Sequence, residues 1–161
     1  MQIEARPASE ADLPELTRLY RLLEAEQAEL KSLWPVADGI AEPIEHSFRG
    51  ILDDVDSSIV IGTIDDVPFG FLWMRLEELL PQADGAKVGS ARLVFVQLEA
   101  RGVGVGEAMI TMTLENFRGR GVRLFDSHVS PGHRLAKNFF ESNGFSARRI
   151  VMHHSEDTRW R

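Results

Sequence analysis

The feature that most constrains this chain is the stretch LEARGVGVGEAMITMTLENFRGRG, which runs from Leu98 to Gly121. Glycines stand at 102, 104 and 106, the apolar run LVFV precedes them, and a helical spacing of apolar residues follows. The stretch therefore predicts a strand, a tight turn and a helix whose bare N–H groups and positive dipole end could hold an anion such as a phosphate. The alternative is that the glycines only serve the tight connection.

Two common phosphate-binding loops do not fit this stretch. A P-loop requires Gly-Lys-Ser/Thr after its last glycine, and this chain has Gly106-Glu107-Ala108. A dinucleotide fingerprint counted from Gly104 would need a glycine or alanine where Met109 stands. The sequence thus argues against both nucleotide-binding classes.

Hydrophobic periodicity predicts the remaining elements. Strands are expected where β-branched and apolar residues alternate or run together, and helices where leucines and phenylalanines recur at helical spacing. The expected order is strand 3–6, helices 12–30 and 43–54, a hairpin of strands 57–64 and 69–79, strand 90–98, helix 104–118, strand 122–129, helix 132–145 and strand 146–154. This order predicts an α/β fold with a mixed sheet whose parallel crossover lies in the second half.

Composition limits the classes of partner. The chain has 161 residues, which suits one domain, and it has no cysteine, which excludes disulfides and thiolate metal sites. The net charge of −7 disfavours nucleic acid and anionic membranes and mildly favours cationic partners. The opening residues do not read as a signal peptide and no apolar run is long enough to cross a bilayer, so we expect a cytoplasmic protein. We also expect no metal site.

Two motifs carry a family resemblance. Arg101-x-x-Gly104-x-Gly106 resembles the pyrophosphate loop of the GNAT superfamily of N-acetyltransferases, which reads Q/R-x-x-G-x-G/A. The later segment from His133 to Phe145 is similar to that family's N-x-x-A-x-x-x-Y-E-x-x-G-F, and its alanine, glutamate, glycine and final phenylalanine stand at the family's offsets. The opening segment IEARPASEADLPEL also looks like the family's first strand and helix, so the resemblance spans nearly the whole chain.

The resemblance implies a fold and a cosubstrate. It implies one GNAT-like domain over residues 1–161, with a mostly antiparallel twisted sheet of six to seven strands, a splayed central parallel pair and about four helices. It also implies that acetyl-CoA lies in the gap of the splayed pair. The residues implied to bind it are Val94, Phe95, Val96, Arg101, Gly102, Val103, Gly104, Val105, Gly106, Glu107, His133 and Phe140.

The proton-transfer groups depart from the family pattern. Phe140 stands where the family often has a tyrosine acid, and Arg92 and Leu93 stand near the usual glutamate base. His128 and Asp126 share one face of the expected strand 122–129, so they are the remaining catalytic candidates, although both could be ordinary polar contacts. Trp34, Glu77 and Glu78 are candidates for binding the acceptor, with core packing or solvent contact as the alternative.

The sequence therefore indicates an N-acetyltransferase. Acetyl would move from acetyl-CoA to a primary amine of a small molecule or to a peptide amino group, by direct attack in a ternary complex of a monomer or homodimer. A cationic acceptor suits the negative net charge. The alternatives are a non-catalytic acyl-CoA-binding or sensor module and, third, a structural partner domain.

Overall fold

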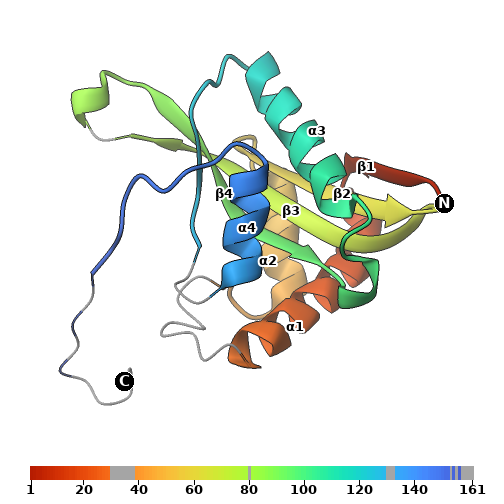
Figure 1. Cartoon of the computed structure of the whole chain (residues 1–161). Coiled ribbons are helices and arrows are strands. Elements are labelled where there is room, and N and C mark those ends of the chain that lie inside the picture. The colour runs from red at the N-terminus through yellow and green to blue at the C-terminus, as the bar shows by residue number, and fades with distance from the viewer. Residues whose placement is uncertain (30–38, 80, 130–132, 153, 155, 157–161) are drawn as a thin grey trace.

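The computed structural model describes residues 1–29, 39–79, 81–129, 133–152, 154 and 156. Its centre is one sheet of five strands in the order β1-β2-β3-β4-β5 (Figure 1). The strands are β1 (Ile3–Pro7), β2 (Ser57–Ile64), β3 (Val67–Glu78), β4 (Lys87–Val96) and β5 (Phe125–Ser127). The α-helices are α1 (Leu13–Glu29), α2 (Ile44–Asp53), α3 (Val105–Gly119) and α4 (Arg134–Ser142), and 3-10 turns span Glu10–Asp12, Pro81–Ala83 and Leu98–Ala100.

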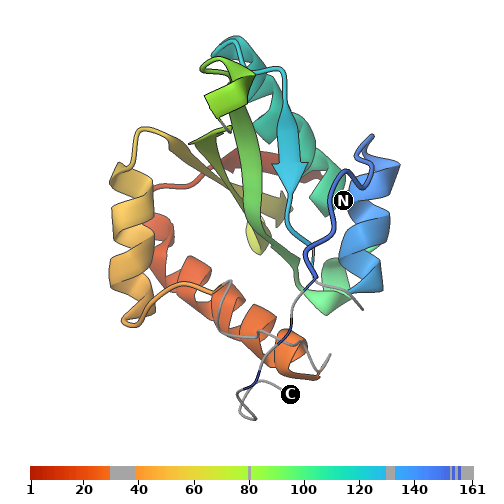
Figure 2. The same ribbon diagram turned by 90° about the vertical axis from the view of Figure 1, so that its left-hand side faces the viewer.

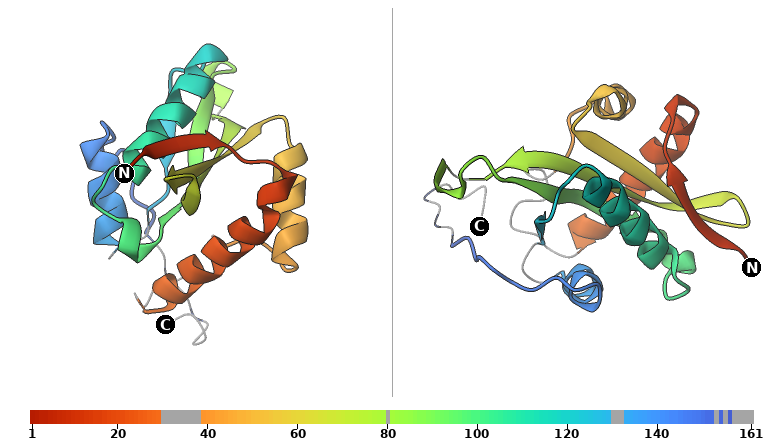
Figure 3. Two further views of the ribbon diagram at one scale, coloured as in Figure 1. Left: turned by 90° about the vertical axis from the view of Figure 1, so that its right-hand side faces the viewer. Right: turned by 90° about the horizontal axis from the view of Figure 1, so that it is seen from above.

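Helices cover both faces of the sheet. Figure 2 shows α1 and α2 on one side and α3 and α4 on the other, and Figure 3 shows the same layers from two further directions. Phe48 of α2 and Leu16 of α1 are buried against one face, and Met109 and Phe117 of α3 against the other. The apolar spacing read from the sequence therefore produces two cores, one on each side of the strands.

A β-bulge in β4 changes which face its side chains meet. Trp73 of β3 pairs with Leu93 and the next residue, Met74, pairs with Ala91, so Arg92 is the extra residue. As a result Ala91 packs with α3, whereas Leu93 packs with α1 and α2. A bulge bends and twists its strand, and here it lies where β4 leaves β5.

The predicted parallel crossover is confirmed. β4 and β5 pair in parallel through Gly89–Phe125, Ser90–Asp126 and Ala91–Ser127, and α3 connects them in the chain. Pairing stops at Ala91, while β4 continues to Val96. Among the described residues, no strand therefore pairs with the last five residues of β4 on the side away from β3.

Four details of the predicted fold were wrong. The sheet has five strands in the described residues, not six or seven, and its parallel pair lies at one edge rather than at the centre. The expected strand 122–129 contracts to Phe125–Ser127. The expected strand 146–154 does not form over 146–152, which is coil after α4 (Figure 1).

The last of these errors has a physical cause. Residues 150–152 are the consecutive apolar residues Ile-Val-Met, as a buried strand would have, but Ile150 and Met152 are 77% and 88% exposed, and no strand of the described residues pairs with them. Strand formation depends on a neighbouring strand more than on the intrinsic preference of the residues.

None of the helices in the described part of the chain is both long and apolar enough to cross a bilayer.

Candidate functional site

The glycine turn presents unpaired backbone amides at the start of α3. Gly102 and Gly104 have φ of 80° and 105°, a conformation that residues with a Cβ rarely adopt, and Gly104 is the N-cap of the helix. The first bond of the helix runs from the Ala108 amide to the Gly104 carbonyl. The amides of residues 102–107 have no acceptor among the described residues, so they are free to donate hydrogen bonds to the oxygens of an anion.

The three glycines have different roles. A Cβ on Gly102 would meet nothing within 4 Å, and one on Gly104 would meet only Ile3, at 3.9 Å. A Cβ on Gly106 would lie 2.7 Å from Cε1 of Phe139 in α4. Gly102 and Gly104 are therefore required by the turn, while Gly106 is required by the close contact between α3 and α4.

The end of β4 offers backbone groups to the side away from β3. The Gln97 amide donates to the Phe69 carbonyl of β3, so the alternation of an antiparallel ladder turns the N–H and C=O of Val94 and Val96 the other way. Phe95 instead faces β3 with its backbone, and its side chain is buried beside α1. Of the predicted contacts on β4, Val94 thus offers both its N–H and its C=O to an extended ligand, whereas Val96 offers its N–H, because its C=O already accepts a hydrogen bond from Arg101.

Arg101 makes contacts that the sequence did not reveal. Its Nε donates to the Val96 carbonyl at 2.7 Å, and its two Nη atoms bind both carboxylate oxygens of Glu26 in α1 at 2.8 and 2.9 Å. Its guanidinium also lies 5.5 Å from the centre of the Phe95 ring. This side chain therefore ties α1 to the end of β4 and fixes the start of the glycine turn.

The α4 residues of the second motif serve the fold. The Nδ1 atom of His133 accepts a hydrogen bond from the Ala136 amide at 3.1 Å, which makes His133 the N-cap of α4. Phe140 is 5% exposed, and its ring meets those of Phe139 and Phe145 edge-on at 5.1 and 5.2 Å. Position 140 therefore lies in the apolar core beneath α3.

Of the two catalytic candidates, Asp126 lies in β5 and His128 follows the last residue of that strand, Ser127. Asp126 pairs in register with Ser90, which itself pairs with Arg75, so the three lie side by side across β5, β4 and β3. Arg148 forms a bidentate ion pair with Asp126, and this hydrogen bonding, with a lesser contribution from the charge of Arg148, lowers the pKa of Asp126. Asp126 is therefore an ionised, occupied carboxylate, whereas His128 follows β5 where the strands separate.

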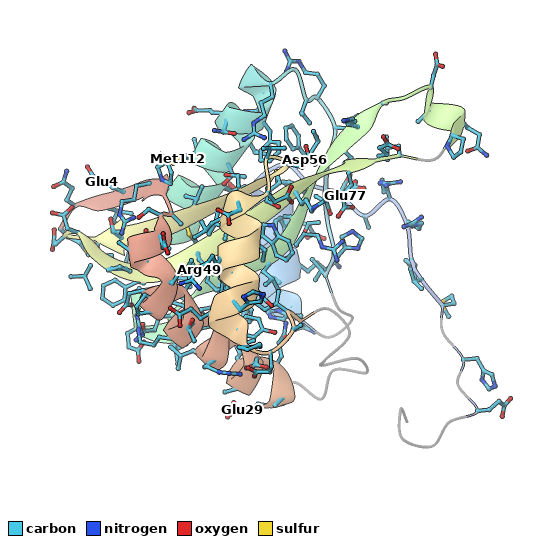
Figure 4. The ribbon with its side chains drawn as sticks, turned by 180° about the vertical axis from the view of Figure 1, so that it is seen from behind. Glu4, Glu29, Arg49, Asp56, Glu77 and Met112 are labelled. Carbon is cyan, nitrogen blue, oxygen red and sulfur yellow. The ribbon has the colours of Figure 1, made fainter. Side chains whose placement is uncertain are left out.

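A hollow of about 440 Å³ lies on the same face, between α2 and strands β3 and β4. It is lined by Ile40, Ala41, Ser47, Gly50, Ile51, Asp54, Trp73, Arg75, Glu77 and Arg92. Figure 4 shows Glu77 near Asp56, which follows α2 and accepts a hydrogen bond from the Leu76 amide at 2.8 Å. Glu77 thus lines the hollow, Glu78 does not, and Trp34 lies outside the described residues.

A second hollow, of about 560 Å³, lies between β1 and α3. Glu107 lines it together with Glu4, Met112 and Glu115, and Figure 4 labels Glu4 and Met112 there. Three carboxylates and no cation line this surface, so it does not suit a phosphate. The Glu107 side chain therefore points to the β1 side of the turn, and only its backbone amide belongs with the glycines.

Sequence reasoning missed the residues whose partners are distant in the chain. Glu26, Asp54 and Arg75 belong to separate elements, and only the fold brings them to Arg101 and to the hollow. One signal was present in the sequence, because Trp73, Arg75 and Glu77 place polar groups at alternate positions of an otherwise apolar strand. Such a pattern indicates a strand face that is not wholly covered by core.

Solved structures share this fold. That of AAC(6')-Iy in complex with the bisubstrate analogue CoA-S-monomethyl-acetylneamine is 18% identical with a TM-score of 0.76, and the match covers 98% of this chain and 100% of that one. The aminoglycoside acetyltransferase meta-AAC0020, from an uncultured soil metagenomic sample and in complex with sisomicin, is 18% identical with a TM-score of 0.71 over 96% and 95% of the two chains. The fold is therefore one found in acetyltransferases.

The sequence identifies the family. The profile of the Acetyltransferase (GNAT) family matches residues 17–145, and the chain belongs to this family of acyltransferases. The mycothiol acetyltransferase of Thermobispora bispora is 32% identical over 77 residues, which are 48% of this chain and 26% of that protein. The chain thus matches about a quarter of that relative's length.

Proposed function

We propose that residues 1–161 act as one N-acetyltransferase domain that moves the acetyl group of acetyl-CoA to a primary amine, on a small molecule or on a peptide. The observation that carries this proposal is a combination of two features of the described residues: the amides of residues 102–107 have no acceptor there, and the edge of β4 beside them has no pairing strand. The turn would hold the diphosphate, and Val94 and Val96 would bind the pantetheine arm like a neighbouring strand. Family membership supports the reaction class.

The chemistry requires positioning more than proton transfer. Acetyl-CoA supplies an already activated thioester; an N–C bond forms, the C–S bond breaks, and the amine loses a proton. His128 stands where β4 and β5 separate, and it is the proposed acceptor of that proton, directly or through water. Phe140 is buried and has no proton to give, so the thiolate would leave unprotonated or take a proton from solvent.

The acceptor would enter from the face opposite α3. Trp73 pairs with Leu93, and Arg92 lies next to it at the bulge, so one end of the hollow adjoins the open edge of β4. An amine is protonated in solution, and the negative net charge of the chain favours its approach as a cation. The ligands named for the solved structures, a bisubstrate analogue that joins CoA to an acetylneamine and the compound sisomicin, support an amine of small-molecule size.

Calorimetric titration with CoA tests the proposed cosubstrate site. Gly104→Val should weaken binding at least tenfold, because a branched side chain at φ of 105° would distort the turn and crowd the diphosphate. Gly85→Val is the matched control, since Gly85 has φ of 79°, open space around its Cβ and a place in the distant β3–β4 connection. Equal affinity in all three proteins would mean that the glycines serve only the turn.

A further inference from the structure

We propose that the hollow beside α2 binds an acceptor that carries a carboxylate close to its amine, as an amino acid does, with Arg75 and Arg92 as the residues that recognise the carboxylate. This inference rests on the proposed function, and it identifies the substrate class of that site. It also refines the expectation of a simply cationic acceptor. The lining contains two arginines and two carboxylates, so the local charge of the hollow does not follow the net charge of −7.

The two arginines extend from the sheet into the hollow, and each guanidinium donates a hydrogen bond to one carboxylate of the lining. Arg75 donates from Nε to Asp54 at 3.0 Å, and Arg92 donates from Nη1 to Glu77 at 3.0 Å. Their side chains are 41% and 38% exposed. Each guanidinium is therefore anchored yet still open to a ligand.

The hydrogen-bond donors that are left without an acceptor in the hollow favour an anionic ligand. Asp54 accepts from the Asp56 amide, the Ser57 hydroxyl and Arg75, and these bonds, the one from Ser57 most strongly, lower the pKa of Asp54. Within the described part of the chain, Nη2 of Arg75 and Nε and Nη2 of Arg92 have no acceptor. Both arginines thus keep N–H groups free after they have donated to the carboxylates of the lining. A planar carboxylate of a ligand matches the geometry of these free N–H groups.

The position of the arginines sets where the carboxylate lies on the acceptor. Arg92 is the bulge residue at the point where β5 pairing ends, two residues before Val94. A carboxylate bound by Arg92 therefore places an amine one or two carbons away at the open edge of β4. Trp73, whose indole N–H donates to Ser57 at 3.1 Å, together with Ile51, forms an apolar wall for the rest of the molecule.

Thiol release with matched acceptor pairs tests the inference. Each common amino acid is compared with its carboxamide, and rates are expressed per neutral amine because the two amines have different pKa values. The wild type should favour the carboxylate partner of its best pair by about tenfold to a hundredfold in kcat/KM, the range expected for a charge-assisted bond. Equal or greater kcat/KM for the carboxamides would overturn the inference while leaving the acetyltransferase intact.

Variants of the arginines test whether Arg92 causes the preference for the carboxylate. Arg92→Gln should reduce the preference to within about twofold by lowering only the carboxylate rates, and Arg92→Lys should restore part of it. Arg49→Gln is the control, because Arg49 lies on α2 but pairs with Glu10 and does not line the hollow (Figure 4). An unchanged preference in Arg92→Gln would contradict the assignment.

Product binding separates this inference from the proposed function. Calorimetry in the presence of CoA compares N-acetyl amino acids with their N-acetyl carboxamides, and it needs no turnover. Tighter binding of the carboxylates that is lost in Arg92→Gln would support the site even if no acetyl transfer occurred, in which case only the proposed activity would fail. Equal binding of both sets would overturn the site.

Discussion

At the scale of single residues, Phe140 shows why a motif position and a functional position can differ. The residue stands at the family's frequent tyrosine, yet its ring lies between those of Phe139 and Phe145. Packing against these two rings is therefore enough to explain why an aromatic residue stands at this position of the motif. The hydroxyl of a tyrosine here would need a hydrogen-bond partner that an apolar cluster does not supply.

Phe140→Tyr should consequently lower stability and leave the chemistry unchanged. Burying a hydroxyl without a partner costs roughly 1–3 kcal/mol. Denaturant unfolding gives the free energy, and thiol release per folded molecule gives the rate. A variant of wild-type stability with faster turnover would show that position 140 reaches the thioester.

Asp12 is a residue whose ionisation stabilises the fold. Its carboxylate accepts two hydrogen bonds from Arg6 at 2.8 Å and one from the Ser9 amide at 2.8 Å, and the bonds from Arg6 are the main reason that its pKa is lowered. They join β1 to the start of α1. Because the folded-state pKa lies below the unfolded value of about 3.9, this stabilisation is present above that value and disappears as the pH falls through the folded-state pKa.

Asp12→Asn should therefore cost about 1–2 kcal/mol at pH 7. The difference from the wild type should shrink as the pH falls below about 4, where the unfolded wild type begins to take up the proton, and it should disappear below the folded-state pKa. Urea unfolding of both proteins over a pH series provides the measurement. A gap that stays constant into acid would show that the carboxylate charge does not matter.

At the scale of elements, the glycine turn was predictable and its neighbours were not. A strand, positive-φ glycines and an amphipathic helix follow each other directly in the chain, so local chemistry specifies them. The contraction of β5 and the absence of a strand over 146–152 depend on which segments lie alongside, and periodicity carries no such information. The ion pair of Arg101 with Glu26 likewise joins residues 75 positions apart.

The contact between α3 and α4 offers a prediction at this scale. Gly106→Ala should destabilise the fold by about 1–3 kcal/mol, because the new methyl group would lie 2.7 Å from the Phe139 ring and the helices would have to separate. Gly119→Ala, in the same helix with open space around its Cβ, should be neutral or stabilising by up to about 1 kcal/mol. Thermal unfolding compares the two, and equal melting temperatures would contradict the packing role of Gly106.

At the scale of the whole molecule, the fold places two unlike surfaces on opposite faces of one sheet. The amides of the glycine turn lie at the α3 side, and the hollow with Arg75 and Arg92 lies at the α2 side. The end of β4, unpaired on its outer edge in the described residues, lies between them. A cosubstrate bound from one face and an acceptor from the other could therefore meet at that edge without either leaving first.

Initial-rate kinetics test this arrangement most directly. Acetyl-CoA and an amine acceptor are varied together, and thiol release is matched to the acetylated amine by mass spectrometry. Direct attack in a ternary complex predicts intersecting double-reciprocal lines and one acetylated amine for each thiol released. Parallel lines, which are the pattern of a covalent acetyl-enzyme, or CoA binding with no acetylated product from any amine would contradict the account.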